Sequence, residues 1–168
     1  MSQSEFKIKS TIYTAIALFI FDAFVMNQGA IAAITIFIIF LWLLPKSVFL
    51  KYKNKSPKVL LTKALIYGVM ALAVFSANFV NNKLAKYRAE KLIVAIEAFH
   101  QSTGSYPEKL TDLVPGYIPA VPMAKYTLIF NKYWYIKDKD NASLFYVALP
   151  PFGRPTYSFT RQSWSYLD

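Results

Sequence analysis

The chain contains no cysteine and only one histidine among its 168 residues. Without cysteine it can form no disulfide, thiolate nucleophile or cysteine-based metal site. His100, the single histidine, has no second histidine to share a transition metal with, so we expect it to be a partly exposed structural residue. The sequence also lacks a nucleophile elbow, a glycine-rich phosphate loop and a carboxylate pair at catalytic spacing. We therefore expect no enzymatic activity, no catalytic residue, no cofactor and no metal site.

Acidic residues are scarce as well: nine stand against 19 lysines and arginines, which gives a net charge of +10. Six of the lysines lie in residues 45–63, a segment that contains no acid and separates two apolar runs. Lysines beside apolar runs are explained by the retention of positive loops in the cytoplasm and by attraction to anionic lipid. We therefore expect membrane lipid, and not nucleic acid, as the partner of this charge.

Three apolar runs are long enough to cross a bilayer: residues 11–26, residues 30–44 with a continuation to about residue 50, and residues 60–80. The first run is interrupted by Asp22 and no signal-peptidase site follows it, so it is predicted to be a retained span. Asn27, Gln28 and Gly29 are predicted to form a tight external turn between the first two spans. The sequence thus predicts three transmembrane helices.

The lysine segment 45–63 orients these spans, because short basic connections between transmembrane helices stay in the cytoplasm. Lys7 and Lys9 place the N-terminus on the same side. The first two spans then form a hairpin, and the third carries everything after residue 82 out of the cytoplasm.

The helical pattern continues beyond the third span. Apolar residues recur at helical spacing at Leu84, Leu92, Ala95, Ile96 and Phe99, which predicts an amphipathic extension that ends at Gly104. Ser105 and Glu108 have capping-box spacing, with Pro107 between them, and predict a short second helix that ends at residues 115–116.

From residue 126 the pattern changes to short aromatic and β-branched runs separated by turn residues, which predicts an antiparallel meander covered by the apolar side of the helix. The predicted strands are residues 126–130, 133–137, 143–149, 156–160 and 164–167. The KDKDN sequence around residue 140 is predicted to be a hairpin turn, because it lacks the further ligands of a calcium loop. The fold class is a membrane α-helical protein plus an α+β domain. The parts are residues 1–59 (transmembrane hairpin and lysine loop), 60–104 (long helix) and 105–168 (loop and sheet).

Residues 92–122, LIVAIEAFHQSTGSYPEKLTDLVPGYIPAVP, resemble the stretch that ends the long helix and opens the loop in type IV pilins and in the major pseudopilins of type II secretion. The likeness includes Thr103-Gly104-x-Tyr106-Pro107 and covers about thirty residues. It implies a pilin-like α+β domain. The third span lacks the leader, the processing glycine and the glutamate of a pilin, so the chain is not expected to be a prepilin-peptidase substrate.

Two extra spans ahead of a pilin-like helix resemble the pilin-specific accessory proteins of Gram-negative bacteria. That resemblance implies a bacterial inner-membrane protein with a periplasmic C-terminal domain. It further implies binding to the major type IV pilin and modulation of pilus assembly or retraction, hence a part in fimbrium biogenesis and twitching motility.

Three other readings stay open. The chain is alternatively a membrane-anchored, pseudopilin-like component of a secretion or DNA-uptake machine that contacts inner-membrane platform proteins through residues 51–58. A second alternative is an enzyme that modifies pilin sugars or lipids, which usually needs more spans or clustered acids and histidines. The third is a tethered domain with an unrelated partner.

Candidate partner-binding residues follow from the pilin-binding reading. Asp22 is an intramembrane carboxylate that either has a structural role, bonded to a neighbour such as Ser76 or Asn78, or contacts a pilin. Small residues of the third span allow close helix packing, and outward aromatic residues of the sheet offer a binding face, although both tryptophans there are expected to be core. The candidates are Asp22, Gly68, Ala71, Leu92, Ile96, Phe99, Trp134 and Trp164.

Overall fold

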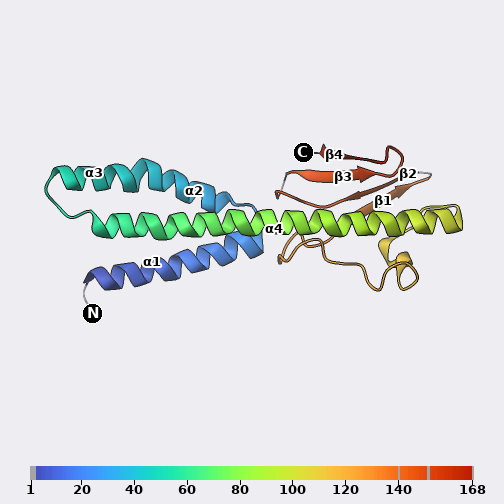
Figure 1. The fold of residues 1–168 in the computed structure, drawn as a ribbon, viewed down its shortest axis with the longest axis horizontal. Helices are drawn as coiled ribbons and strands as arrows, with labels where there is room; N and C mark the ends of the chain where they lie inside the picture. Colours follow the sequence, from blue (N-terminus) through green and yellow to red (C-terminus); the bar gives the residue numbers. More distant parts are fainter. Residues whose placement is uncertain (1–2, 140, 151, 168) are drawn as a thin grey trace. The chain divides into compact units, whose positions relative to one another are not determined.

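The computed structural model describes residues 3–139, 141–150 and 152–167, and Figure 1 shows the order of their helices and strands. The helices are α1 (Gln3–Ile20), α2 (Ala30–Ile38), α3 (Leu44–Tyr52) and α4 (Lys58–Thr103). The π-helical segments η1 (Phe21–Met26) and η2 (Ile39–Leu43) follow α1 and α2, and the 3-10 turn η3 (Leu110–Leu113) follows α4. The strands are β1 (Trp134–Asp138), β2 (Asn141–Phe145), β3 (Arg154–Ser158) and β4 (Ser163–Leu167).

Three helices within these described ranges are long and apolar enough to cross a membrane: Gln3–Met26, Ala30–Tyr52 and Lys58–Thr103. The predicted spans fall inside them, so the prediction of three helices of membrane-spanning length and composition is confirmed. The first helix begins earlier than the predicted span, at Gln3. The third continues beyond the span to Thr103 as α4, as the predicted amphipathic extension requires.

Pro45 explains the π-helical segment between α2 and α3. Proline has no backbone N–H, and its ring displaces the carbonyl of the residue four positions earlier, here Leu41. A locally wider turn accommodates both effects without ending the helix. Accordingly η2 (Ile39–Leu43) precedes Pro45, and helical structure resumes in α3 up to Tyr52.

The predicted turn between the first two apolar helices is confirmed at residues 27–29. Asn27 has φ 52° and Gly29 has φ 72°, so both residues lie in the left-handed region. Asparagine and glycine adopt that region more readily than other residues. The chain therefore reverses direction within three residues.

The small apolar core of the first part lies between α1, α2 and α4. It consists of Ala15, Ala32, Met70, Ala71 and Val74, all buried. Three of the five are alanines, and small side chains let membrane helices approach closely.

The end of α4 is as predicted. Gly104 has φ 77°, a conformation that costs glycine little, and its N–H donates to the carbonyl of His100 at 2.8 Å. The predicted capped helix after it is wrong, because its two capping residues bond elsewhere. Glu108 pairs with Lys137, and the carbonyl of Ser105 accepts from the Thr103 hydroxyl. The 3-10 turn η3 stands in its place, and the Asp112 carboxylate there accepts from the N–H of Lys109.

The sheet has four antiparallel strands in the order β1-β2-β3-β4, so the predicted meander is confirmed for the last four of its five strands. Trp134 pairs with Phe145, Leu144 with Tyr157, and Tyr157 with Trp164. Asp138 pairs with Asn141, so the predicted hairpin turn around residue 140 is also confirmed, although residue 140 itself lies outside the described ranges.

The predicted strand at residues 126–130 is wrong. The N–H of Tyr126 donates to the side chain of Asn81 at 3.2 Å, and the hydroxyl of Thr127 donates to the carbonyl of Ile129. The N–H of Ala124 donates to the carbonyl of Asn131, which closes this segment into a loop. The N–H of Tyr126 and the carbonyl of Ile129 are therefore engaged outside any sheet.

One side of the sheet packs on the second half of α4, as predicted. The buried helix residues are Ala85, Ala89, Leu92, Ala95 and Ile96. The sheet contributes Leu144, and its partly buried residues include Tyr157; Tyr146, directly after β2, is also buried in this core. The edge-to-face ring pair of Tyr157 and Phe159, with centroids 5.1 Å apart, extends this core.

The chain divides into two compact units, Met1–Phe79 and Val80–Asp168. We call them the membrane unit and the sheet unit. The boundary falls inside α4, whereas the predicted three-part division placed its boundaries at residues 59 and 104.

Candidate functional site

Asp22 is a buried helix cap. Its side chain is fully buried, Oδ1 accepts from the N–H of Gly29 at 2.9 Å, and Oδ2 accepts from the N–H of Ala32 at 2.8 Å. Both donors belong to the start of α2, where backbone N–H groups have no partner within the helix. These contacts favour the structural role of Asp22. Its partners are backbone N–H groups, whereas Ser76 or Asn78 was predicted from the sequence.

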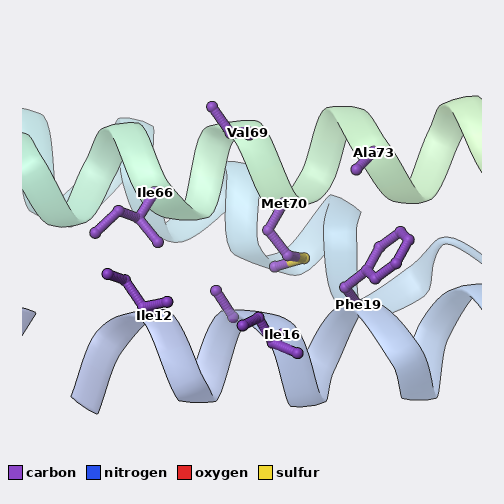
Figure 2. Close-up of a pocket in the computed structure, with 8 residues that line it drawn as sticks. Ile12, Ile16, Phe19, Ile66, Val69, Met70 and Ala73 are labelled. Atoms are coloured by element: carbon purple, nitrogen blue, oxygen red, sulfur yellow. The ribbon is translucent and has the colours of Figure 1, made fainter. Parts of the chain in front are cut away.

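An apolar groove of about 210 Å³ lies between α1 and α4 in the membrane unit. Figure 2 shows Ile12, Ile16 and Phe19 of α1 facing α4 across it. The α4 side is formed by Ile66, Val69, Met70 and Ala73. All lining residues are apolar, so the groove suits hydrocarbon and offers no group for catalysis.

The small residues Gly68 and Ala71 lie on different sides of α4. Ala71 is fully buried in the core of the membrane unit, so in this conformation it is not available to a partner. Gly68 lies beside exposed Leu65 and Leu72, and a Cβ added to it would meet nothing within 4 Å. We call Leu61, Leu65, Gly68 and Leu72 the exposed stripe of α4.

Three candidates on the second half of α4 pack against the protein's own sheet or loop. Leu92 and Ile96 are buried in the core of the sheet unit, and Phe99 packs against that core with its ring 5.4 Å from that of Tyr117. The apolar side that was predicted to cover the sheet does so. In this structure the protein's own sheet unit buries Leu92 and Ile96 and partly buries Phe99, and their assignment as partner-binding residues stays a prediction.

The two tryptophans of the sheet differ in environment. Trp164 is half-buried against the core, near Tyr146 and Tyr157, as expected of a core residue. Trp134 is 54% exposed and stacks on Phe145 on the side of the sheet away from α4, so the expectation that it is core is wrong. A shallow pocket of about 310 Å³ lies there, lined by Trp134, Phe145 and Arg154 among others.

A set of polar contacts fastens the loop before β1 to α4. Arg88 donates to the carbonyl of Met123 at 2.8 Å and to the hydroxyl of Tyr126, and its guanidinium lies 4.6 Å from the centre of the Tyr126 ring. The hydroxyl of Tyr133 donates to the carbonyl of Ala85. Burial raises the pKa of Tyr133 above its ordinary value, which keeps this hydroxyl protonated as a donor.

Lys125 is the most unusual charged residue of the sheet unit. It is fully buried, and its Nζ donates to the carbonyl of Ala148 at 2.8 Å. Among the described residues no carboxylate forms an ion pair with it, since Lys137–Glu108 is the pair found there. Burial lowers the pKa of Lys125 to about 7, because desolvation disfavours its charged form.

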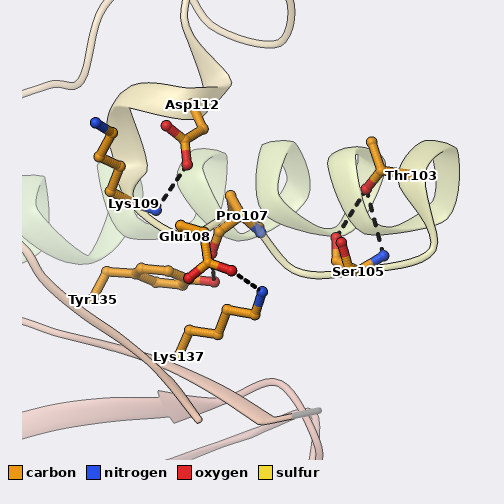
Figure 3. A network of polar contacts seen from close by, with 8 residues as sticks. All are labelled: Thr103, Ser105, Pro107, Glu108, Lys109, Asp112, Tyr135 and Lys137. Carbon is orange, nitrogen blue, oxygen red and sulfur yellow. Dashed lines mark hydrogen bonds and ion pairs between the residues drawn. The ribbon is translucent and has the colours of Figure 1, made fainter. Parts of the chain in front are cut away.

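Contacts with β1 hold the loop that follows α4 (Figure 3). The hydroxyl of Tyr135 donates to the carbonyl of Pro107 at 2.9 Å, and Lys137 forms an ion pair with Glu108. The glutamate side chain is largely exposed, so this pair adds little stability on its own. The hydrogen bond from Tyr135 is the better anchor of the Tyr106-Pro107 part of the loop.

His100 stacks on Tyr106, with ring centroids 4.0 Å apart. It is partly buried, in keeping with the structural role expected of it. No group of three or more histidine, cysteine or acidic residues that could hold a metal ion occurs among residues 3–139, 141–150 and 152–167.

Sequence reasoning did not single out Lys125 or Arg88. Nothing in a sequence distinguishes a buried lysine from the exposed ones around it, because the carbonyl that Lys125 meets belongs to Ala148, 23 positions along the chain. No protein-family model, no curated protein and no solved structure matches this chain.

Proposed function

We propose that this protein is a non-enzymatic accessory protein of a bacterial inner membrane that binds the major type IV pilin and modulates pilus assembly or retraction. One observation carries the proposal: α4 is a continuous helix of 46 residues whose first part is apolar enough to span a membrane and whose second part covers an antiparallel sheet. That plan, together with the loop motif at residues 103–107, is what resembles a pilin. A pilin-like α+β domain is part of the proposal.

The exposed stripe of α4 is the surface we assign to the pilin. In lipid, helices associate through close packing, and a glycine lets two backbones approach. Gly68 supplies such a notch between the exposed side chains of Leu65 and Leu72. Ala71, Leu92 and Ile96 are left out of this surface because the protein's own core buries them.

The experiment is photocrosslinking in living cells of the natural host. A photoreactive amino acid is placed in turn at Leu61, Leu65 and Leu72, and at the buried positions Ala64 and Val74 as controls. Crosslinks to the major pilin from the first three positions and none from the controls would support the proposal. Crosslinks only to platform proteins or to unrelated envelope proteins would overturn it.

A substitution that fills the notch tests the surface separately. Gly68→Leu adds a side chain into open space and raises helix propensity, so the protein itself should be no less stable. We expect the pilin crosslinks from Leu65 to fall while the protein level stays unchanged. The matched control is Phe37→Leu, at an exposed apolar residue of α2 in the same unit.

A further inference from the structure

Exposed apolar side chains gather in two loops of the sheet unit. Leu128 and Ile129, in the loop before β1, are 76% and 45% exposed. Leu149 and Phe152, in the turn between β2 and β3, are 50% and 67% exposed. Large apolar side chains that project from loops cost free energy in water, and clusters of them mark interaction surfaces.

Both loops lie at the same end of the sheet unit. Trp134 at the start of β1 pairs with Phe145 at the end of β2, and Leu149 bridges to Phe152 just beyond it. The loop before β1 is bonded to the first residues of α4 in this unit, through Asn81 to Tyr126 and through Ala85 to Tyr133. This is the end at which α4 enters the unit from its apolar, membrane-length part.

Two exposed basic residues, Lys132 and Arg154, lie at the end with the apolar loops. Residues 113–137 and 141–167 contain no acid, although Asp168 follows Leu167, the partner of Arg154 in the sheet. Two acids lie at the opposite end: Glu108 pairs with Lys137 near the end of β1, and Asp138 lies at the β1–β2 turn. Basic side chains are thus available beside the apolar loops.

Apolar loop tips with basic residues around them match the interface of an anionic bilayer, where apolar groups enter the headgroup region and lysines and arginines meet lipid phosphates. Exposed Tyr126 and Trp134 belong to the same end, and tyrosine and tryptophan favour this interface.

We propose that this end of the sheet unit docks on the anionic bilayer surface that α4 crosses. Leu128, Ile129, Leu149 and Phe152 enter the boundary between headgroups and acyl chains. Lys132 and Arg154 contact lipid phosphates. The docking would hold the sheet unit against the membrane whether or not a pilin is bound, so it does not depend on the proposed function.

The test uses the full-length protein in proteoliposomes without any partner. Because the chain has no cysteine, Leu128→Cys and Phe152→Cys each give a single site for a nitroxide spin label. Collisions with oxygen, which is concentrated in lipid, are compared with collisions with a water-soluble nickel complex. The matched control is Val94→Cys, a 71% exposed apolar position on α4 farther from this end.

Docking predicts labels at residues 128 and 152 that lie about 5–10 Å into the interface and favour oxygen, with a water-like label at residue 94. The double variant Lys132→Gln/Arg154→Gln should shift both labels toward water in vesicles that contain phosphatidylglycerol, and less so in pure phosphatidylcholine. Labels at 128 and 152 as water-exposed as the control would overturn the proposal. So would labels shielded from both reagents, which would mean that protein covers the loops.

Discussion

Asp22 and Lys125 are both fully buried charged residues, but their surroundings differ. Asp22 accepts two backbone hydrogen bonds at the start of a helix, where the helix dipole also favours a negative charge. Lys125 donates to one backbone carbonyl, that of Ala148. The first arrangement satisfies two backbone donors, whereas burial of Lys125 disfavours its charged form.

We expect Asp22→Ala to destabilise the hairpin of the first two helices by about 1–3 kcal/mol, because it leaves the N–H groups of Gly29 and Ala32 without acceptors. The measurement is helix loss in mixed micelles, followed by circular dichroism as a denaturing detergent is added. Ser10→Ala, at an exposed residue of α1, is the control and should leave the midpoint unchanged. An unchanged midpoint for Asp22→Ala would refute the capping role.

Lys125 makes the stability of the sheet unit depend on pH. Its pKa is about 7 in the folded chain and 10.5 when unperturbed, so between these values the unfolded chain binds one more proton. Stability should therefore rise with pH across this window and be lowest, with the full burial penalty, below pH 7. Tyr133, whose pKa is raised, opposes this only at higher pH, where ordinary tyrosines ionise.

Lys125→Met should abolish this rise and stabilise the sheet unit on the order of a few kcal/mol at the acidic end of the window. The measurement is urea unfolding of the full-length protein in micelles, followed by near-ultraviolet circular dichroism at a series of pH values. Lys109→Met, which removes an exposed lysine, should keep the pH dependence. If the free energy of unfolding changed equally with pH in wild type and in Lys125→Met, Lys125 would not be the source of the pH dependence.

At the scale of elements, α4 has its buried residues at helical spacing in both units. That regularity is why the sequence predicted the long helix and its end at Gly104. The strand at residues 126–130 was predicted wrongly because the N–H of Tyr126 donates to Asn81, a contact that spans 45 positions and that no local pattern reveals. The prediction of a capped helix at residue 105 was wrong for a similar reason, since Glu108 forms an ion pair with the distant Lys137.

The placement of Leu92 can be tested against a neighbour on the same helix. Leu92→Ala should cost about 2–4 kcal/mol of the free energy of unfolding of the sheet unit, because it opens a cavity between α4 and the sheet. Val94→Ala, two positions away and exposed, should change it by roughly 0.5 kcal/mol or less. Chemical unfolding of the full-length protein measures both. Equal effects would mean that Leu92 is not a core residue.

At the scale of the whole molecule, the sequence predicted the candidate spans and most of the sheet, but only part of the candidate site. Apolar runs and hydrophobic periodicity involve residues that are close together in the sequence, so they can be recognised without the structure. Which side of a helix stays exposed is decided by distant partners, and that is why Gly68 could not be separated from Ala71, nor Trp134 from Trp164.

Orientation in the membrane remains a prediction that rests on the lysine segment. Single cysteines at Ser56, in that segment, and at Gln101, near the end of α4, are both at exposed positions. In intact cells with a permeabilised outer membrane, a membrane-impermeant maleimide should label the cysteine at 101 and spare the one at 56. Disrupting the inner membrane should make both react. Labelling of 56 alone in intact cells would reverse the topology.

The position of β4 at the border of the sheet has a practical consequence. Within the described part of the chain β4 pairs with β3 alone, so its other side presents backbone N–H and C=O groups to any extended chain. Its sequence, SWSYL, contains neither a charge nor a proline, the residues that usually block such pairing. We therefore expect concentrated preparations of the protein to associate through strand pairing at β4. A single substitution at an exposed residue of β4, Ser163→Lys, should reduce this pairing, and it changes the protein less than a solubility tag would.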